Sequence, residues 1–480
     1  MADRKNQSEK ASAFTKLGVP LVLVMAVFVL KWSSLHTPYY WDEAGAYFSP
    51  SFWLSSRELL DALPGRHPAE MFFGHPPLLY LLMAGLFKLF GTAPAVAHLP
   101  VFLFAALGIL YTYRLGLLLF SRDIAVGAAV LLFSTPLFFA QAGMFLGDIP
   151  VAACGVAAVY YYFRRSSCQY LLFAIAAVLI KEHAALLIVI LLLYDCCKLS
   201  GHAAMHRQKL IHAVPLVILG IFFLAQKLMT GSFLPNPYFI SNPFFSLSGG
   251  KILFKIAFVN YWAFFAQGRF LLTLAIVMAV WRFRKSLSGS FPLFAMIVGS
   301  YVMAYSFIYF IPRYILIVTP FICLTGSASV ALLLKGRFRY AAAVALLSLV
   351  SLLLPDIRNS GYDNFETSMQ YRDVVSTHQE AGTYLQRVSS GGLIYAPWPL
   401  SSVWADSAFG YVATPLPVTT DPNSSWEYIV FTPQADRGQA EAIDSLIRKG
   451  GVKRVARFER SGKEIDVFSR KATDLKQEGL

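Results

Sequence analysis

Long apolar segments recur along the first 355 residues and are separated by short polar or basic stretches. Apolar runs near the ~20 residues that a helix needs to cross a bilayer predict membrane-spanning helices. From about residue 356 the pattern changes to short alternating and helical segments that are typical of a soluble domain. The sequence therefore predicts a polar tail at 1–16, a membrane region at 17–355 and an α/β domain at 356–480.

Basic clusters lie between the apolar segments and set the predicted topology. They occur at residues 164–165, 198–209, 282–285 and 335–339. Because cytoplasmic loops of membrane proteins carry an excess of Lys and Arg, we place all four clusters inside. This arrangement predicts a cytoplasmic N-terminus, about eleven crossings, and a C-terminal domain outside. The first apolar stretch, residues 17–35, has no small-residue cleavage site, so we expect an uncleaved first helix.

Two segments are too short to cross comfortably. Residues 77–90 predict a helix that lies along the outer leaflet, within the first external loop. Residues 166–198 must hold two crossings with Lys181-Glu182-His183 at the bend. Each arm of about 15 residues gives roughly 22 Å, which is short of the ~30 Å hydrocarbon core. We therefore expect the bend to lie inside the outer leaflet and to face a cavity, because charged groups facing lipid are costly.

Composition supports a membrane protein and excludes nucleic-acid binding as the reason for its charge. The 480 residues are 56% hydrophobic and only 14% charged, whereas soluble proteins carry about 25% charged residues. The net charge is +14, yet residues 356–480 hold 14 Lys and Arg against 16 Asp and Glu. The basic excess thus belongs to the membrane region, where loops face anionic lipid headgroups. The five cysteines show no disulfide framework and no metal-binding spacing.

The soluble part predicts a small α/β domain without a recognisable catalytic motif. Its periodicity indicates helices at 371–388 and 435–449, and strands at 392–396, 427–432, 453–458 and 464–468. The chain shows no internal repeat, which weakens a transporter interpretation, since many transporters are built from repeats.

On the predicted topology, polar residues from distant parts of the chain share the outer face. They are Asp42, Glu43, His75, Asp148, Lys181, Glu182, His183 and Arg313, with Arg269 as a lesser candidate. Lys181 and Arg313 could stabilise charge on a phosphate oxygen. Asp42 could accept a proton from an acceptor hydroxyl as a general base. Asp148 could orient the acceptor or hold a cation.

Several of these residues could instead have a purely structural role. Asp42 and Glu43 could be solvated loop residues, His75 could start a helix, and Asp148 could be an N-cap before Pro150. Arg313 could extend to the interface. The bend at Lys181 is harder to explain structurally, because its depth makes idle charges expensive. We expect the histidines at 202, 206 and 212 to lie in a solvated basic loop.

Metal use stays open at this point. A hard divalent cation prefers carboxylates such as Asp42 and Asp148, whereas zinc would accept His75 as well. We therefore keep these three residues as candidate ligands, and a divalent cation as the only cofactor that the residues suggest.

Taken together, the motifs resemble the GT-C integral-membrane glycosyltransferases, in particular the protein O-mannosyltransferase and lipid A aminoarabinose transferase group. The resemblance rests on Trp41-Asp42-Glu43, Gly74-His75-Pro76-Pro77-Leu78, Ala97-His98-Leu99-Pro100, Asp148, Lys181 and Arg313-Tyr314. Two positions depart from the group's pattern. His98 stands where Arg is common, and Glu182 follows Lys181 where Gly is common.

The resemblance implies inverting sugar transfer from a polyprenyl-phosphate donor, undecaprenyl or dolichyl, at the periplasmic or luminal face of the cell membrane. Asp42 would be the catalytic base, with Asp148 and Glu43 beside it in the catalytic group. Lys181 and Arg313 would hold the lipid phosphate. From their predicted place at the outer face, we add Arg269 to the phosphate-binding group, and His75, Tyr314, Glu182 and His183 as substrate contacts. The acceptor could be a protein, lipid A or another glycan. Two alternatives are a lipid-linked-sugar flippase with an external domain and a membrane-anchored binding protein.

Overall fold

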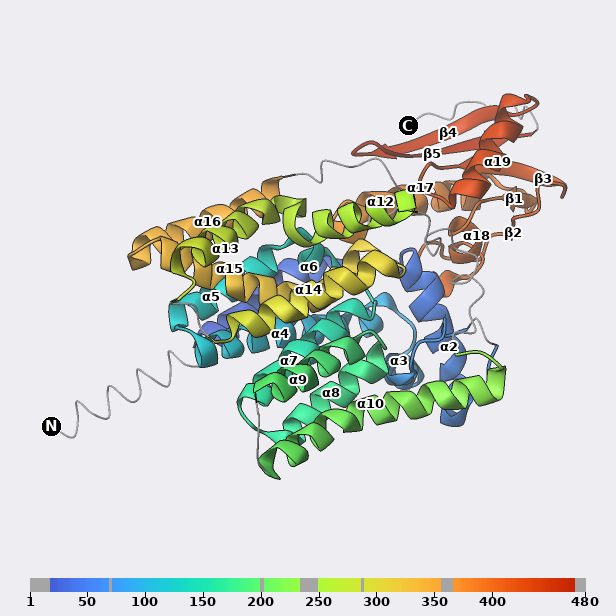
Figure 1. Ribbon diagram of the computed structural model, residues 1–480. Helices are drawn as coiled ribbons and strands as arrows, with labels where there is room; N and C mark the ends of the chain where they lie inside the picture. The colour runs from blue at the N-terminus through green and yellow to red at the C-terminus, as the bar shows by residue number, and fades with distance from the viewer. Residues whose placement is uncertain are drawn as a thin grey trace, which may run out of the picture.

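The computed structural model describes residues 18–68, 71–198, 203–233, 249–285, 289–354 and 366–470. It consists of a bundle of apolar helices with a small sheet and its helices at one end (Figure 1). The predicted tail at 1–16, Glu70, most of the predicted external loop at 230–250 and His202 lie outside the described residues. The side chains of residues 203–209, His206 among them, also lie outside the description.

The first half of the chain forms an apolar helix at Gly18–Ser34, whose last turn is η1, and then a loop that contains short helices. These elements are η1 (Trp32–Ser34), η2 (Glu43–Phe48), α2 (Ser49–Ser55), η3 (Leu59–Ala62) and α3 (Leu78–Phe90). Longer helices follow: α4 (Pro94–Leu119), α5 (Arg122–Ser134), α6 (Pro136–Gln141), α7 (Asp148–Phe163), α8 (Ser167–Ile180), α9 (Ala184–Lys198) and α10 (Ala203–Thr230). The expected helix after the Gly-His-Pro-Pro motif and the expected bend between two helices are both confirmed.

The second half completes the bundle. Its elements are α12 (Gly249–Asn260), η5 (Tyr261–Phe265), η6 (Ala266–Gly268), α13 (Arg269–Phe283), α14 (Phe291–Phe307), η7 (Pro312–Ile317), α15 (Thr319–Leu333) and α16 (Arg337–Leu353). One expectation for the bundle is wrong: residues 124–145 do not form a single span. Thr135 adopts φ −66° and ψ 117°, and α6 begins at Pro136, because a residue before proline is driven out of the helical region.

The chain is a multi-pass membrane protein whose helices differ widely in length. In the described part, three helices are long and apolar enough to cross a bilayer: Pro94–Leu119, Leu210–Thr230 and Gly250–Phe283. Seven further apolar helices have 10 to 17 residues. The figure of eleven crossings therefore stays a prediction.

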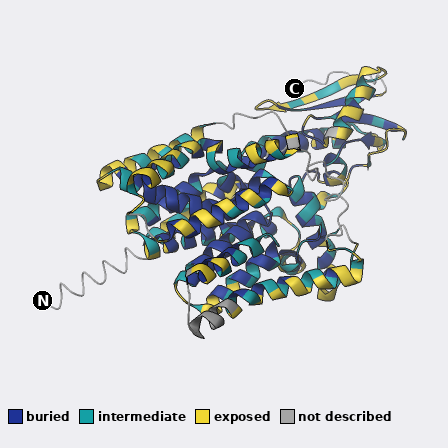
Figure 2. Cartoon of the chain, in the orientation of Figure 1, coloured by how far each residue is buried: buried dark blue, intermediate teal, exposed yellow. Residues whose placement is uncertain are grey.

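Helix α7 lies in the middle of the bundle and is buried along most of its length (Figure 2). It packs against α4 and α8. Small side chains on α7, such as Ala153, Gly155 and Ala157, allow neighbouring helices to approach closely, as is common in membranes. A Cβ added at Gly155 would lie 3.2 Å from Leu187 Cδ2 of α9. This packing fixes the first residue of α7, Asp148, at one end of the bundle.

The C-terminal sheet has the strand order β2-β1-β3-β5-β4. Strand β1 (Leu393–Tyr395) pairs in parallel with β2 (Val418–Thr419) and β3 (Trp426–Phe431). Strand β5 (Lys463–Ser469) pairs antiparallel with β3 and with β4 (Lys453–Arg460), Val430 lying opposite Val467. Helix α17 (Tyr371–Val388) packs on β4 and β5, and α19 (Arg437–Arg448) packs on β3. The four predicted strands and both predicted helices are present, whereas the two-residue β2 and the short α18 (Leu400–Val403) and η9 (Ser407–Phe409) were not expected.

The C-terminal region packs directly on the first loop of the membrane region. The rings of Trp41 and Trp398 meet edge to face with centroids 4.6 Å apart. Phe409 stacks edge-on against Phe48 at 4.9 Å, and its carbonyl accepts a hydrogen bond from Tyr39 N at 3.2 Å. The loop that holds Asp42 and the soluble sheet therefore lie at the same end of the bundle.

The two ends of α7 provide a test of orientation. Asp148 begins this 16-residue helix and Arg164 follows its end, so the two are separated by about 24 Å along the axis. In a background without native cysteines, we expect a membrane-impermeant maleimide to label Lys449→Cys, directly after α19, in intact cells. Arg164→Cys should be labelled only after permeabilisation. Labelling of both from the outside would contradict the predicted topology.

Candidate active site

A buried guanidinium joins three segments that are far apart in sequence. Arg313 lies in η7, and its side chain is 7% exposed. Its Nη2 donates a hydrogen bond to Asp42 Oδ2, and its Nη1 is paired with Glu366 Oε2. Its Nε lies 3.1 Å from Asp148 Oδ2, close enough for an ion pair but not aligned as a hydrogen bond. Each nitrogen of Arg313 therefore faces a different carboxylate.

Asp148 also binds the second cation of the site. Lys181 Nζ donates to Asp148 Oδ1 at 2.7 Å, and both side chains are at most 2% exposed. Lys181 ends α8 in an extended conformation, which turns the chain inward at the bend. Its ammonium lies 4.2 Å from the ring centre of Tyr314, a cation–π contact. Asp148 therefore bridges Lys181 and Arg313 and holds both cations at one point.

Asp42 is the most open carboxylate of this cluster. Its side chain is 35% exposed, against 12% for Glu366 and 1% for Asp148. It stands immediately before the π-helix η2 and makes no capping hydrogen bond there. Trp41 has a positive φ of 48° and directs the chain into this turn. Asp42 is thus the carboxylate that a hydroxyl group could approach.

Glu43 lies next to Asp42 in sequence but belongs to a different, fully buried contact. Its Oε1 accepts from His98 Nε2 at 2.5 Å and from Phe145 N at 2.6 Å, and its Oε2 accepts from Tyr40 N at 3.1 Å. His98 Nδ1 lies 3.1 Å from the carbonyls of Ser34 and Leu35. Both ring nitrogens of His98 therefore face oxygen atoms. Glu43, expected in the catalytic group, is not brought to the Arg313 cluster and instead ties the first loop to α4.

Two phenols from the C-terminal region lie near this buried carboxylate. Burial raises the pKa of Tyr371 and of Tyr411 above the usual range, and the charge of Glu43 raises both further. Both phenols therefore stay neutral around Glu43.

The other residues of the bend have partners of their own. Glu182 Oε2 pairs with His75 Nδ1 at 2.8 Å. His183 Nδ1 lies 3.0 Å from Tyr305 OH, and its carbonyl accepts from Tyr301 OH at 2.8 Å. The bend is therefore fixed to three elements: α7 through Lys181, the first loop through Glu182, and α14 through His183.

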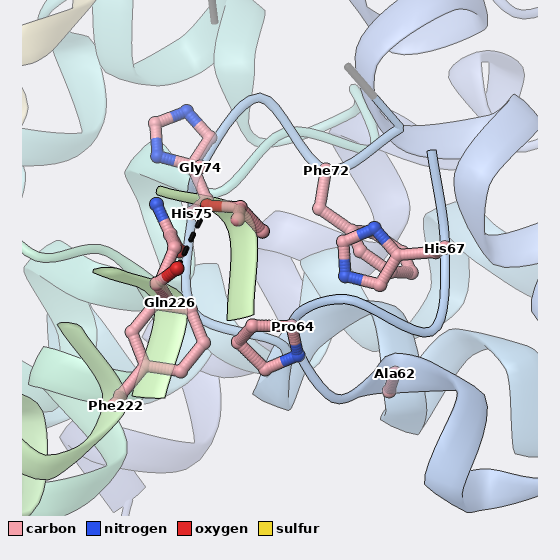
Figure 3. A pocket seen from close by; sticks show the side chains of 9 residues that line it. Ala62, Pro64, His67, Phe72, Gly74, His75, Phe222 and Gln226 are labelled. Atoms are coloured by element: carbon pink, nitrogen blue, oxygen red, sulfur yellow. Dashed lines mark hydrogen bonds between the residues drawn. The ribbon is translucent and has the colours of Figure 1, made fainter. Parts of the chain in front are cut away.

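A pocket lies beside His75 (Figure 3). It separates the first loop from α10, and it is lined by Ala62, Pro64, His67, Phe72, Gly74, His75, Phe222, Gln226 and Thr230. His75 is not the first residue of a helix, since α3 begins at Leu78. Its side chain connects this cavity to the bend at Lys181.

Arg269 lies apart from the cluster. It begins α13, its Nε donates to Ala266 O at 3.2 Å, and it lines a separate cavity together with Cys323 and Ser351. The expectation that Arg269 would join the phosphate-binding group is therefore not reflected in the geometry.

The sequence did not predict one residue of the cluster, Glu366, and it predicted the wrong environment for His212, which lies outside the cluster. Glu366 precedes α17, in a stretch with no motif, so only the fold could reveal it. His212 was expected in a solvated loop, but it is buried. Its Nε2 lies 3.1 Å from Asp195 Oδ2, and its Nδ1 lies 2.6 Å from Tyr170 OH. Asp148 was considered as an N-cap, but Gly147 occupies the cap position and α7 starts at Asp148.

The candidate metal ligands do not gather into one group. Across the described ranges, no group of three or more His, Cys, Asp and Glu side chains is arranged to hold a metal. Asp42 and Asp148 meet only through Arg313, and His75 faces Glu182.

Comparison with known proteins defines the class of this protein. The structure resembles ArnT from Cupriavidus metallidurans in the apo state, with a TM-score of 0.57, 15% identity, and 94% of this chain and 98% of that chain covered. ArnT bound to undecaprenyl phosphate gives a TM-score of 0.58 at 15% identity, with the same coverage. The oligosaccharyltransferase AglB from Archaeoglobus fulgidus, in complex with an inhibitory peptide and a dolichol-phosphate, gives 0.51 at 12% identity and covers 97% and 75%. The chain therefore has the GT-C fold of integral-membrane glycosyltransferases.

The family match is more specific than the fold. Residues 74–225 match the family described as dolichyl-phosphate-mannose-protein mannosyltransferase. A search among curated proteins finds no match. The matched segment runs from the Gly-His-Pro-Pro motif through Asp148 and Lys181 to α10. The chain is a glycosyltransferase with the GT-C fold, and its residues 74–225 are similar to the mannosyltransferases.

The buried Glu43–His98 pair generates a stability prediction. Glu43→Ala leaves the buried His98 ring and two backbone N–H groups without their carboxylate partner. Each buried polar group left without a partner costs about 1–3 kcal/mol, so we expect a marked fall in the Tm of the purified protein in detergent. Glu380→Ala removes an exposed ion pair with Arg460 and should change stability by about 1 kcal/mol or less. Equal Tm values for the two variants would show that Glu43 does not anchor the loop.

Proposed function

We propose that this protein transfers a sugar from a polyprenyl-phosphate donor to an acceptor hydroxyl, with inversion at the anomeric carbon. One observation carries the proposal: two buried cations, Lys181 and Arg313, are held on Asp148, while the more open Asp42 contacts the same guanidinium. A site for transfer from a phosphate needs cations at the leaving oxygen and a base for the nucleophile.

The reaction assigns a separate task to each group. The acceptor oxygen attacks the anomeric carbon and loses its proton to Asp42. The bond from that carbon to the phosphate oxygen breaks, and the phosphate leaves with the electron pair and one more negative charge. Lys181 and Arg313 stabilise this charge, with Arg313 offering several fixed N–H donors. A single displacement of this kind inverts the anomeric configuration.

Asp148 serves as the positioning residue. It is 1% exposed and contacts both cations, so it is too enclosed and too strongly paired to act on a hydroxyl. As the first residue of α7, it also carries negative charge at the positive end of a helix dipole, which is favourable. Its charge holds Lys181 and Arg313 together against their mutual repulsion.

The relatives support the lipid nature of the donor. ArnT and AglB, which share the fold, were solved with undecaprenyl phosphate and with a dolichol-phosphate. We infer a donor of this type for this chain, entering from the bilayer between apolar helices. The acceptor class, whether protein, lipid A or another glycan, follows from neither the site nor the fold. Tyr314, His75, Glu182 and His183 lie next to the cations and are our candidates for substrate contacts.

We further infer that the site faces outward. The four basic turns of the sequence all belong to the membrane region, and Arg164 lies at the opposite end of α7 from Asp148. The positive-inside bias then supports eleven crossings, with the C-terminal domain outside the cell membrane. The clustering of charge at one end of the bundle favours a transferase over a flippase, whose site would lie near the bilayer midplane.

The base assignment predicts a selective loss of chemistry. Asp42→Asn keeps the size of the side chain and removes its basicity, and loss of a general base costs about 10²–10⁴ in rate. We expect a deletion strain that carries this variant to lack the modified envelope glycan or lipid by mass spectrometry, although the protein is present in the membrane. Asp61→Asn in η3 of the same loop should restore the product. Normal product with Asp42→Asn would remove this residue as the base.

The phosphate assignment predicts weaker binding of the lipid. Lys181→Ala removes one charge-assisted contact, worth about 1.5–3 kcal/mol, so the Kd for undecaprenyl phosphate should rise roughly tenfold or more. Lys88→Ala on α3, an exposed lysine, is the matched control and should bind normally. Binding measured by calorimetry in detergent micelles would decide the matter, and an unchanged Kd for Lys181→Ala would exclude a phosphate contact.

A further inference from the structure

The third carboxylate on Arg313 comes from outside the membrane bundle. Glu366 belongs to the C-terminal region and lies shortly before α17 begins at Tyr371, yet its Oε2 pairs with Arg313 Nη1. The side chain is 12% exposed. No step of the proposed reaction uses this residue, so its presence at the most important guanidinium of the site needs an explanation.

Two buried amides fix the backbone at this point. Gln141 Nε2 donates to Glu366 O at 2.7 Å, and Gln267 Nε2 donates to Thr367 O at 2.8 Å. Gln267 is itself held, because its Oε1 accepts from Leu137 N at 3.1 Å and its carbonyl accepts from Ser351 Oγ at 2.8 Å. The backbone of Glu366 and Thr367 is therefore tied to α6, η6 and α16. Only the Glu366 side chain can move without breaking these contacts.

Every nitrogen of Arg313 faces a carboxylate in this arrangement. Asp42, Asp148 and Glu366 take one nitrogen each. The cluster holds two cations and three carboxylates, so a donor phosphate, itself an anion, would raise an existing negative excess in a buried site. Like charges at such short range cost several kcal/mol in a poorly hydrated environment. Displacement of one carboxylate from Arg313 would therefore favour the binding of a phosphate there.

Glu366 is the carboxylate best suited to leave. Asp148 is enclosed and also binds Lys181. Asp42 is needed beside the acceptor. Glu366 has a single ion-pair contact, and its second oxygen, Oε1, is buried without a hydrogen-bond partner in the described part of the chain. A buried acceptor without a partner costs about 1–3 kcal/mol, so this side chain loses little when it leaves Arg313.

We propose that Glu366 is a placeholder for the donor phosphate, an anion that occupies Arg313 Nη1 in the empty site and competes with the phosphate group of the polyprenyl lipid. This inference rests on the proposed function, because it takes that phosphate as the ligand. Glu366 keeps the buried guanidinium paired when no donor is bound. It also sets the affinity for donor and product, since every phosphate that binds Arg313 must displace it and every phosphate that leaves is replaced by it.

The test is a substitution that removes the competing charge and keeps the shape. With Glu366→Gln, the Kd for undecaprenyl phosphate should fall five- to tenfold, because the phosphate no longer displaces a carboxylate. Glu366→Asp keeps the charge, and it should bind within about twofold of the unchanged protein. Glu380→Gln in α17 removes an exposed carboxylate of the same region and should leave binding unchanged. Each variant is measured as the full chain in the same detergent, after its Tm has shown that it is folded.

The outcomes separate this inference from the proposed function. If the unchanged protein binds no undecaprenyl phosphate, the proposed donor is wrong and the placeholder role is wrong with it. If the unchanged protein binds and Glu366→Gln binds equally or more weakly, the donor assignment stands and the placeholder is overturned. Undecaprenol, which lacks the phosphate, should show no gain with Glu366→Gln. A similar gain for undecaprenol would place the effect on the lipid chain and overturn the inference. If Glu366→Gln also binds inorganic phosphate more tightly by the same factor, the headgroup alone displaces Glu366, as proposed.

Discussion

The pairing of Lys181 and Arg313 with Asp148 is the constraint on which the rest of the structure depends. Two cations in a bundle this apolar are expensive unless opposite charges and hydrogen bonds surround them. Asp148 supplies the common counter-charge at 2.7 Å and 3.1 Å. The start of α7, the end of α8 and the short helix η7 must therefore meet at one point. Removing Asp148 would take away the carboxylate that Lys181 binds.

Several irregular features of the helices serve this meeting point. The small residues of α7 let α4 and α8 pack closely around it. The interruption at Thr135-Pro136 directs α6 so that Gln141 reaches the segment of Glu366. The bend after α8 directs three consecutive polar residues, Lys181, Glu182 and His183, to partners on three different elements. Straight, uninterrupted spans would satisfy the membrane equally well, but they would not bring these side chains together.

The sequence predicted the parts of this arrangement that leave local patterns. Apolar runs, basic turns and alternating strands identified most helices, the bend at Lys181 and the C-terminal sheet. The motifs Trp-Asp-Glu and Gly-His-Pro-Pro directed attention to Asp42 and His75. The pattern could not tell Asp42 from Glu43, because both are acidic and adjacent. Glu43 is a buried anchor because His98 and Phe145 N contact it, whereas Asp42 remains accessible. For Glu366 there was no local signal, since its role depends on contacts with Arg313, Gln141 and Gln267.

This last point changes how the C-terminal region is understood. Its strands and helices carry no catalytic motif, and its composition differs from that of the membrane region. However, Trp398 and Phe409 pack on the loop that holds Asp42, and Glu366 enters the charge cluster itself. The base and the guanidinium that it contacts are therefore covered from this side by the soluble part of the chain. A catalytic unit cut at residue 355 would lose one of the three carboxylates on Arg313 together with the aromatic contacts that hold the loop, so the site extends across the boundary suggested by composition.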